Sequence, residues 1–183
     1  MRRFDWSVAS SAFEALPLCA GNRQIVRYWL SLWEGDELPL RARFEPLRVR
    51  DLLPGVVIME IKPQERVLIR LSGSAINRAF GMDITGKDIL ALTPERHRAT
   101  RLARNSRVAE GAASFVHRSG ITADGAPWSS EEVQLPFRDL TPDGARLILL
   151  HTSWCPPEGV QDAVLEDVLA PAEDFQTIPL WRD

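Results

Sequence analysis

The stretch of residues 66–87 constrains the fold of this chain more than any other part of the sequence. Apolar and polar residues alternate over residues 66–72, and a period of two is typical of a half-buried strand. Gly73 ends that strand, and Ser74 can cap a short helix that closes at Gly81. The stretch therefore predicts a strand, a short helix and a tight turn in immediate succession.

The clearest helix is predicted for residues 21–35. Its large apolar residues follow the i, i+3, i+4, i+7, i+8 spacing of an amphipathic helix: Ile25, Tyr28, Trp29, Leu32 and Trp33. This face carries three large aromatic rings and must be covered. It either packs on the protein's own sheet or forms a dimer or partner surface, and the candidate surface residues are Tyr28, Trp29 and Trp33.

The same patterns predict the remaining elements in a definite order. Two strands come first, at residues 56–61 and 66–72, and helices follow up to residue 109. A meander of three strands is then predicted at residues 112–118, 128–137 and 145–153, with turn-rich segments between them. This order indicates an α+β domain.

Several residues of this frame also occur in a known family. They are Tyr28, Trp29, Gly35, Leu38, Pro39, Arg41, Pro46, Leu53, Pro54, Arg70, Leu71, Gly73, Gly81, Asp83, Thr85 and Gly86. In order and spacing, residues 24–154 resemble the bacterial stand-alone PAS family, formerly a domain of unknown function, although Ser74 stands where Thr is expected. The resemblance implies a five-stranded antiparallel sheet with helices on one face, and a signalling role. It implies no catalytic residues.

Alternation along the predicted strands assigns an inner sheet face, turned toward the helices of residues 74–109. That face offers candidates for a small-molecule pocket with an apolar wall: Phe115, His117, Val133, Leu135, Leu147, Leu149 and His151. The two histidines are either hydrogen-bonded core residues or polar handles for a ligand. Ile148 and Leu150 fall on the outer face, where the helix of residues 21–35 is expected to cover them. Arg70 also falls there, and the sequence gives no physical account of its role.

The predicted helix of residues 93–109 is rich in arginine. Its basic residues are Arg96, Arg98, Arg101, Arg104 and Arg107, with His97 beside them. Such a side is expected to meet water, or to dock an acidic partner or an anionic ligand. The candidates for a partner surface are Arg98, Arg101 and Arg104.

Length and charge bound the domain organisation. With 183 residues and 45% hydrophobic content, the chain can bury one core. Residues 1–157 hold 21 basic and 18 acidic residues, whereas residues 158–183 hold one basic and seven acidic residues. We therefore expect an N-terminal extension (1–21), a PAS-like domain (22–155) and an acidic tail (156–183) that is dispensable for folding and screens the arginine-rich helix. The charge balance does not favour nucleic-acid binding.

Motifs for metals and cofactors are weak. Cys19 and Cys155 lie far apart, without metal-ligand spacing, so no metal site is expected. Residues 81–88 come close to a phosphate-binding P-loop, but Asp88 replaces the Ser or Thr that would hold magnesium, which favours a structural turn. We expect neither flavin nor haem, although haem-binding PAS domains take an axial ligand from a place similar to that of His97. The cofactor is otherwise unknown.

These features together predict a cytoplasmic sensory or adaptor protein. It would bind a small molecule or a protein partner, signal through protein contacts and be able to form a homodimer. No membrane span is expected, because no apolar run reaches the ~18 residues of a transmembrane helix. Catalysis is not expected. Two alternatives stay open: a small enzyme on a cone-shaped α+β fold of the ketosteroid isomerase kind, and a purely structural dimerisation module.

Overall fold

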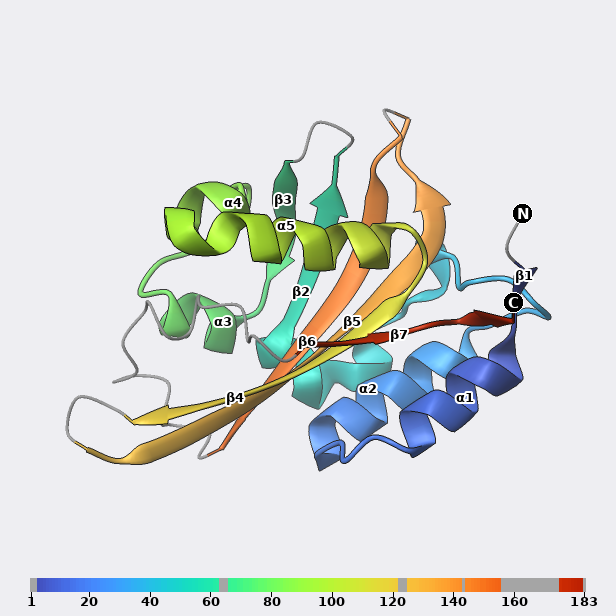
Figure 1. The fold of residues 1–183 in the computed structure, drawn as a ribbon, viewed down its shortest axis with the longest axis horizontal. Coiled ribbons are helices and arrows are strands. Elements are labelled where there is room, and N and C mark those ends of the chain that lie inside the picture. The colour runs from blue at the N-terminus through green and yellow to red at the C-terminus, as the bar shows by residue number, and fades with distance from the viewer. Residues whose placement is uncertain (1–2, 63–65, 122–124, 143, 156–174, 183) are drawn as a thin grey trace.

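The computed structural model describes residues 3–62, 66–121, 125–142, 144–155 and 175–182. A six-stranded antiparallel sheet with the order β3-β2-β6-β5-β4-β7 dominates the fold, and β1 and β8 form a separate pair (Figure 1). The strands are β1 (Arg3–Phe4), β2 (Val56–Ile61), β3 (Val67–Ser72), β4 (Ala113–Ile121), β5 (Pro127–Leu140), β6 (Arg146–Cys155), β7 (Phe175–Ile178) and β8 (Trp181–Arg182). The predicted α+β class is confirmed, and the five predicted strands are β2 to β6.

Helices cover both faces of the sheet (Figure 1). They are α1 (Trp6–Glu14), α2 (Ala20–Ser31), α3 (Ser74–Ala79), α4 (Ile89–Leu92) and α5 (Glu95–Ala109), with 3-10 segments η1 (Arg41–Arg43) and η2 (Pro46–Gly55) between α2 and β2. One face carries α1 and α2, and the other carries α3 to α5. The described residues therefore form two hydrophobic cores. The first core lies between the sheet and helices α1 and α2, and the second core lies between the sheet and helices α3 to α5. Within the described residues, no helix is long and apolar enough to cross a membrane.

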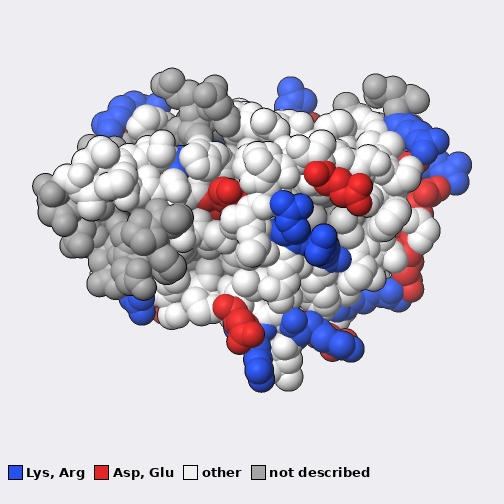
Figure 2. All heavy atoms as spheres, turned by 90° about the horizontal axis from the view of Figure 1, so that it is seen from below, with Lys and Arg blue, Asp and Glu red and all other residues white. Residues whose placement is uncertain are grey.

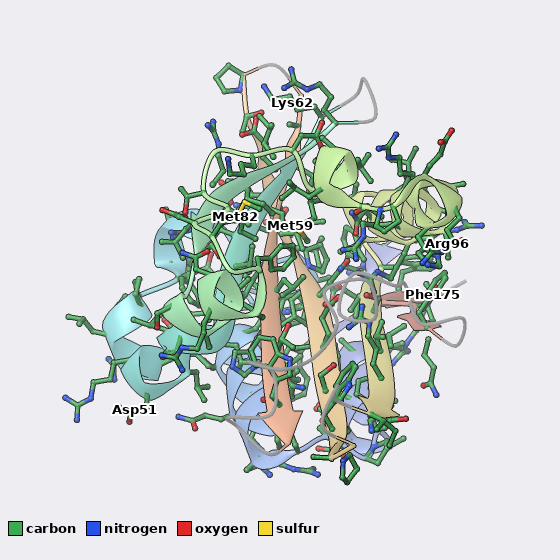
Figure 3. All side chains as sticks on the ribbon, turned by 90° about the vertical axis from the view of Figure 1, so that its left-hand side faces the viewer. Asp51, Met59, Lys62, Met82, Arg96 and Phe175 are labelled. Atoms are coloured by element: carbon green, nitrogen blue, oxygen red, sulfur yellow. The ribbon has the colours of Figure 1, made fainter. Side chains whose placement is uncertain are left out.

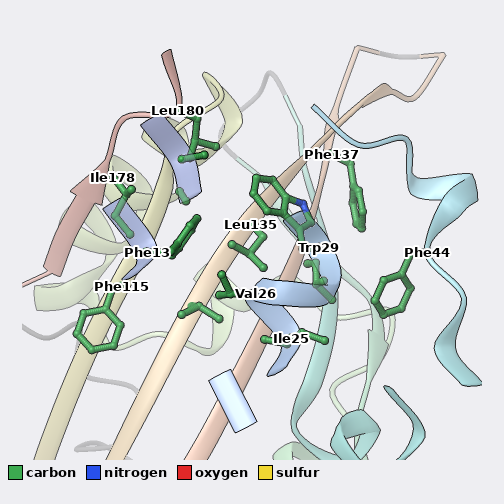
Figure 4. Packing of buried hydrophobic residues seen from close by; sticks show 14 of the residues in the cluster. Phe13, Ile25, Val26, Trp29, Phe44, Phe115, Leu135, Phe137, Ile178 and Leu180 are labelled. Carbon is green, nitrogen blue, oxygen red and sulfur yellow. The ribbon is translucent and has the colours of Figure 1, made fainter. Parts of the chain in front are cut away.

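Trp29 of α2 is the centre of the first core (Figure 4). Its side chain is completely buried, and the rings of Phe13 and Trp33 meet it edge to face at centroid distances of 6.2 and 5.4 Å. Leu135 and Phe137 of β5 belong to the same cluster. The expectation that this amphipathic helix packs on the sheet is confirmed, and its aromatic load is used inside the chain.

The two sheet faces were assigned the wrong way round for strands β4 to β6. Ile148 and Leu150 pack under α3 to α5 rather than against α2, and the alternate residues Leu135 and Leu149 pack with Trp29. Alternation shows which residues share a face of a strand, but the partner of that face depends on strand order and register, and a shift of one residue exchanges the faces.

A β-bulge between β2 and β3 gives Arg70 a role. Ile58 pairs with Leu71, but the next residue, Met59, pairs with Ile69, so Arg70 is the extra residue on β3. The guanidinium of Arg70 forms an ion pair with Glu60, whose side chain is only 1% exposed. Lys62 lies 3.4 Å from the same carboxylate group. Beyond the bulge, Leu71 leaves the face of Ile69 and is 45% exposed.

The C-terminal segment is part of the fold. Strand β7 pairs with β4, β8 pairs with β1, and Ile178 and Leu180 are buried in the first core. The expected acidic appendage is therefore wrong for residues 175–182, because their apolar side chains complete the core beside α1. The helix expected near residues 163–169 lies outside the described residues.

The surface on the side of α1 and α2 carries charges of both signs. Basic and acidic side chains are interspersed there, without a large field of one sign (Figure 2). This distribution agrees with the modest net charge of -3.

Candidate functional site

A cavity of about 50 Å³ lies between the sheet and the central helices. We call it the α5 cavity. Its apolar wall comes from β2, β3, α3, the segment up to α4, and β6, and consists of Val57, Met59, Ile69, Ile76, Phe80, Ile84, Ile89, Leu150 and Trp154. In Figure 3, Met59 lies inside the body of the protein, whereas Arg96 of α5 lies at its outside.

The other end of the α5 cavity is polar. Arg101 of α5, Arg118 of β4 and Glu132 of β5 line it, together with the hydroxyl residues Ser130 and Thr152. All five residues are buried, with at most 8% of their surface exposed. Buried charges need partners, so this end requires a defined set of ion pairs.

Glu132 is the anion at the centre of these pairs. Its Oε1 lies 2.9 Å from Nη2 of Arg104 and accepts a hydrogen bond of 3.1 Å from Nε2 of Gln134. Its Oε2 lies 3.4 Å from Nη1 of Arg118. Strand register explains the meeting, because Glu132 pairs with Val116 of β4 and Thr152 of β6, which places it in the middle of the sheet below α5.

The electrostatics of the cluster follow from burial and crowding. Burial raises the pKa of the Glu132 carboxyl, but Arg104, Arg118 and Arg101 outweigh it and lower that pKa to about 2. Burial lowers the pKa of the Arg101 guanidinium to about 9, helped by Arg104 and Arg118 and opposed by Glu132. Glu132 is therefore ionised at neutral pH, and Arg101 is protonated.

The residues that the sequence predicted for a ligand pocket lie elsewhere. Phe115, Val133, Leu135 and Leu149 belong to the core under α1 and α2, and Leu147 packs against that core from a partly exposed position. Their expected place facing residues 74–109 is wrong, because the sheet faces are exchanged. On the same strands, the residues that alternate with them and face α3 to α5 line the α5 cavity.

The two strand histidines have different surroundings. His117 is exposed, so its expected inward orientation is wrong. His151 is 3% exposed, and its Nδ1 hydrogen-bonds Oδ1 of Asn22 in α2 at 2.7 Å. Burial lowers the pKa of His151 to about 4, although a hydrogen bond with the backbone of Leu52 acts in the opposite direction and raises this pKa. His151 is thus a neutral, hydrogen-bonded core residue on the α2 side.

Glu131 completes this link between α2 and the sheet. Its Oε2 accepts hydrogen bonds from the backbone N–H of Cys19, at 2.7 Å, and from Nδ2 of Asn22, at 3.4 Å. A carboxylate at the first turn of a helix also meets the positive end of the helix dipole. Neighbouring residues Glu131 and Glu132 therefore serve opposite faces of the sheet, one fixing α2 and the other holding the arginines of α5.

The predicted partner surface divides into buried and accessible residues. Trp29, Arg101 and Arg104 are at most 7% exposed, so a partner cannot reach them in this conformation. Tyr28 and Trp33 are partly exposed, and Arg98 is exposed, with its Nε donating to the carbonyl oxygen of Thr93 at 3.0 Å. The broad basic side of α5 is thus not uniformly solvated, because its middle arginines point into the protein.

The segment that resembles a P-loop is a structural turn. Oδ1 of Asp83 accepts a hydrogen bond from the N–H of Thr85 at 2.9 Å, and Oδ1 of Asp88 accepts one from the N–H of Leu90 at 3.0 Å. Gly86 has φ of +79°, which glycine adopts without strain. In the described part of the chain, no cluster of His, Cys, Asp and Glu could hold a metal ion.

The family follows from residues 19–149, which match the model of the PAS domain. The chain belongs to the PAS domain family. The predicted resemblance is confirmed, and the fold is that of a PAS-type sensory module. None of the curated proteins compared with the chain matches it.

Solved structures also match this PAS domain. One of them is the structure of an RsLOV d2 variant, with 18% sequence identity and a TM-score of 0.38. The match covers 60% of this chain and 66% of that chain, which is slightly less than two thirds of the neighbour.

Sequence reasoning missed Arg118 and Glu132. Both are charged residues within predicted strands, and such a residue is either at the surface or paired in the core. The spacing of Arg101 and Arg104 places them on one side of a helix, which was a further signal. The strand register and the position of α5 over the sheet bring these four residues together.

Proposed function

We propose that this PAS domain is a sensor that binds a small molecule in the α5 cavity and signals through contacts with a protein. The observation that carries the proposal is the composition of the cavity. An apolar wall from β2, β3, β6 and α3 meets a buried polar end from α5, β4 and β5. Ligand sites typically combine an apolar lining with a few convergent polar groups.

Helix α5 connects the cavity with the surface of the domain. Arg101 lines the cavity, whereas Arg98 lies one turn earlier on the same helix and is exposed. A ligand that moves Arg101 would move α5, and with it the surface that a partner protein contacts. The proposed output surface includes Arg98 and the partly exposed Tyr28 and Trp33. The proposed partner is another protein or a second copy of this chain.

A fragment screen tests the ligand-binding step. Full-length ¹⁵N-labelled protein is titrated with neutral and charged fragments, and amide shifts are followed by NMR. We expect binders that shift the amides of Met59, Arg101 and Ser130, and we expect Met59→Trp to remove these shifts by filling the cavity. Leu47→Trp is the control, because Leu47 is 83% exposed and lies outside the cavity lining.

The outcome separates a sensor from a structural module. Fragment shifts that persist in Met59→Trp would place the binding outside the α5 cavity and contradict the proposal. A screen without any binder would favour a filled structural core. The output step is tested by measuring the self-association of the protein with and without the best fragment by analytical ultracentrifugation, where a sensor should show a ligand-dependent change.

A further inference from the structure

Two buried hydroxyl groups line the polar end of the α5 cavity. Ser130 of β5 is 4% exposed and Thr152 of β6 is 7% exposed, and both residues belong to the cavity lining. Within the described part of the chain, neither hydroxyl group takes part in a hydrogen bond. A buried hydroxyl group without a partner is costly, so both groups are available to a molecule that enters the cavity.

Strand register fixes the spacing of these two hydroxyl groups. Ser130 pairs with Trp154 and Glu132 pairs with Thr152, so Ser130 and Thr152 are diagonal neighbours on the face below α5. Diagonal neighbours lie about 7–8 Å apart, too far for a direct hydrogen bond between two short side chains but close enough for one bridging oxygen atom. The pair therefore suits a ligand with a single oxygen.

The charged residues at the same end favour a neutral ligand group. Glu132 is engaged with Arg104 and Arg118, and Arg101 and Arg118 have further interactions of their own. An anionic ligand would compete with Glu132 for the arginines, and a cationic ligand would compete with the arginines for Glu132. A neutral oxygen leaves these interactions in place and can bond the hydroxyl groups, because each of them donates and accepts.

We propose that the α5 cavity binds a short-chain neutral molecule with one hydrogen-bonding oxygen, an alcohol or a ketone, held by Ser130 and Thr152. This inference rests on the proposed function, because it concerns the same cavity. The carbon chain lies against the apolar wall formed by Met59, Ile69 and Leu150. A volume of about 50 Å³ is well below the ~150 Å³ of a cavity that accommodates benzene, so the chain has only a few carbon atoms.

NMR titration of full-length ¹⁵N-labelled protein tests this inference. The probes are n-butanol and butanone, and n-butyl fluoride is the matched compound, nearly identical in shape to n-butanol but without a hydrogen-bond donor and with only a very weak acceptor. We expect the alcohol and the ketone to bind about fivefold more tightly than the fluoride, the effect of about one hydrogen bond. The longer n-octanol should bind no more tightly than n-butanol, whereas adsorption to an apolar surface would favour the longer chain.

Substitutions that remove only a hydroxyl group locate the contact. Ser130→Ala and Thr152→Val should each weaken the binding of n-butanol about fivefold and leave the binding of n-butyl fluoride unchanged. Thr152→Ser keeps a hydroxyl group and should bind n-butanol like the wild-type protein. Ser129→Ala and Thr177→Val are the matched controls, because both residues lie outside the cavity lining, and neither change should affect binding.

The outcomes separate this inference from the proposed function. Equal binding of n-butanol and n-butyl fluoride, both lost in Met59→Trp, would overturn the role of the hydroxyl groups and leave the cavity as a ligand site. Tighter binding of butanoate than of n-butanol would overturn the selection of a neutral group. Failure of n-butanol and butanone to shift the amides of Ser130 and Thr152 would also overturn the inference, while the fragment screen would still decide whether the cavity binds ligands. If a variant does not fold, the comparison of n-butanol, n-butyl fluoride and butanoate in the wild-type protein still decides.

Discussion

The indole Nε1–H of Trp29 donates a hydrogen bond to the carbonyl oxygen of Pro136, at 3.2 Å, and ties α2 to the middle of β5. Trp29 is completely buried, and its ring also contacts Phe13 and Trp33. One side chain thus joins α1, α2 and the sheet.

We expect Trp29→Ala to lower the free energy of unfolding by ~3–5 kcal/mol, because the substitution removes a large buried ring and leaves a cavity. Chemical denaturation followed by circular dichroism measures this change. Trp33→Ala is the matched control, since Trp33 is partly exposed and should cost less. Equal unfolding midpoints for Trp29→Ala and the wild-type protein would contradict the packing described for α2.

Glu132→Gln is expected to destabilise the protein by ~3–5 kcal/mol, because it leaves the buried arginines without the carboxylate that contacts them. Thermal unfolding of the purified variant measures the effect. Glu110→Gln serves as the control, because its ion pair with Arg107 is exposed and such pairs contribute little. A variant in which both Arg104 and Glu132 are replaced by apolar residues should recover part of the loss. Similar melting temperatures for Glu132→Gln and Glu110→Gln would contradict the role of the cluster.

His151 predicts a loss of stability in mild acid. Its pKa is lowered to about 4 in the folded protein, below the usual value of 6.5, so the unfolded chain binds a proton more readily. The contribution of His151 is therefore fully present above pH 6.5 and is lost as the pH falls toward 4, by about 3 kcal/mol in total.

Denaturant unfolding at a series of pH values measures this dependence. His151→Gln should show a flatter profile between pH 6.5 and 4, at the expense of some stability at neutral pH. His117→Gln should keep the wild-type profile, because His117 is exposed. A wild-type slope in His151→Gln would mean that other groups cause the acid sensitivity.

The C-terminal strands should be necessary for the fold. We expect Leu180→Ala to cost ~2–5 kcal/mol, because Leu180 is completely buried. A chain that ends at Pro157 should lose cooperative unfolding, since it lacks β7, β8 and the buried side chain of Ile178. Gln176→Ala is the control, because Gln176 lies in β7 but is exposed. A cooperative, wild-type-like melt of the shortened chain would show that these strands are peripheral.

Much of the secondary structure could be predicted from local patterns. Three patterns act over only a few residues: the period-two alternation of β3, the cap and glycine around α3, and the amphipathic spacing of α2. They could therefore be recognised without knowledge of long-range contacts. The order of these elements, with the motif residues between Tyr28 and Gly86, also indicated a PAS domain. Strands β7 and β8 were missed because they are short and lie in an acidic segment.

The candidate site could not be read in the same way. Arg101 and Arg104 were recognised as a basic face of a helix, but the pattern favoured solvent or a partner, and Glu132 is 28 residues away from Arg104 in sequence. Their contact depends on the position of α5 over β5, which is set by the packing of Val108 and the neighbouring apolar residues. Local sequence carries no information about that position.

The sequence by itself determined strands β2 to β6, helices α2, α3 and α5, and most of the side chains that share a face of each of these strands, because these properties depend on neighbours a few positions apart. The tertiary structure decided which layer each face meets. The bulge at Arg70, the register between Glu132 and Val116, and the return of Ile178 to the edge of β4 are long-range pairings. A shift of one residue in any such pairing exchanges core and cavity, and only the packing of the whole sheet fixes it.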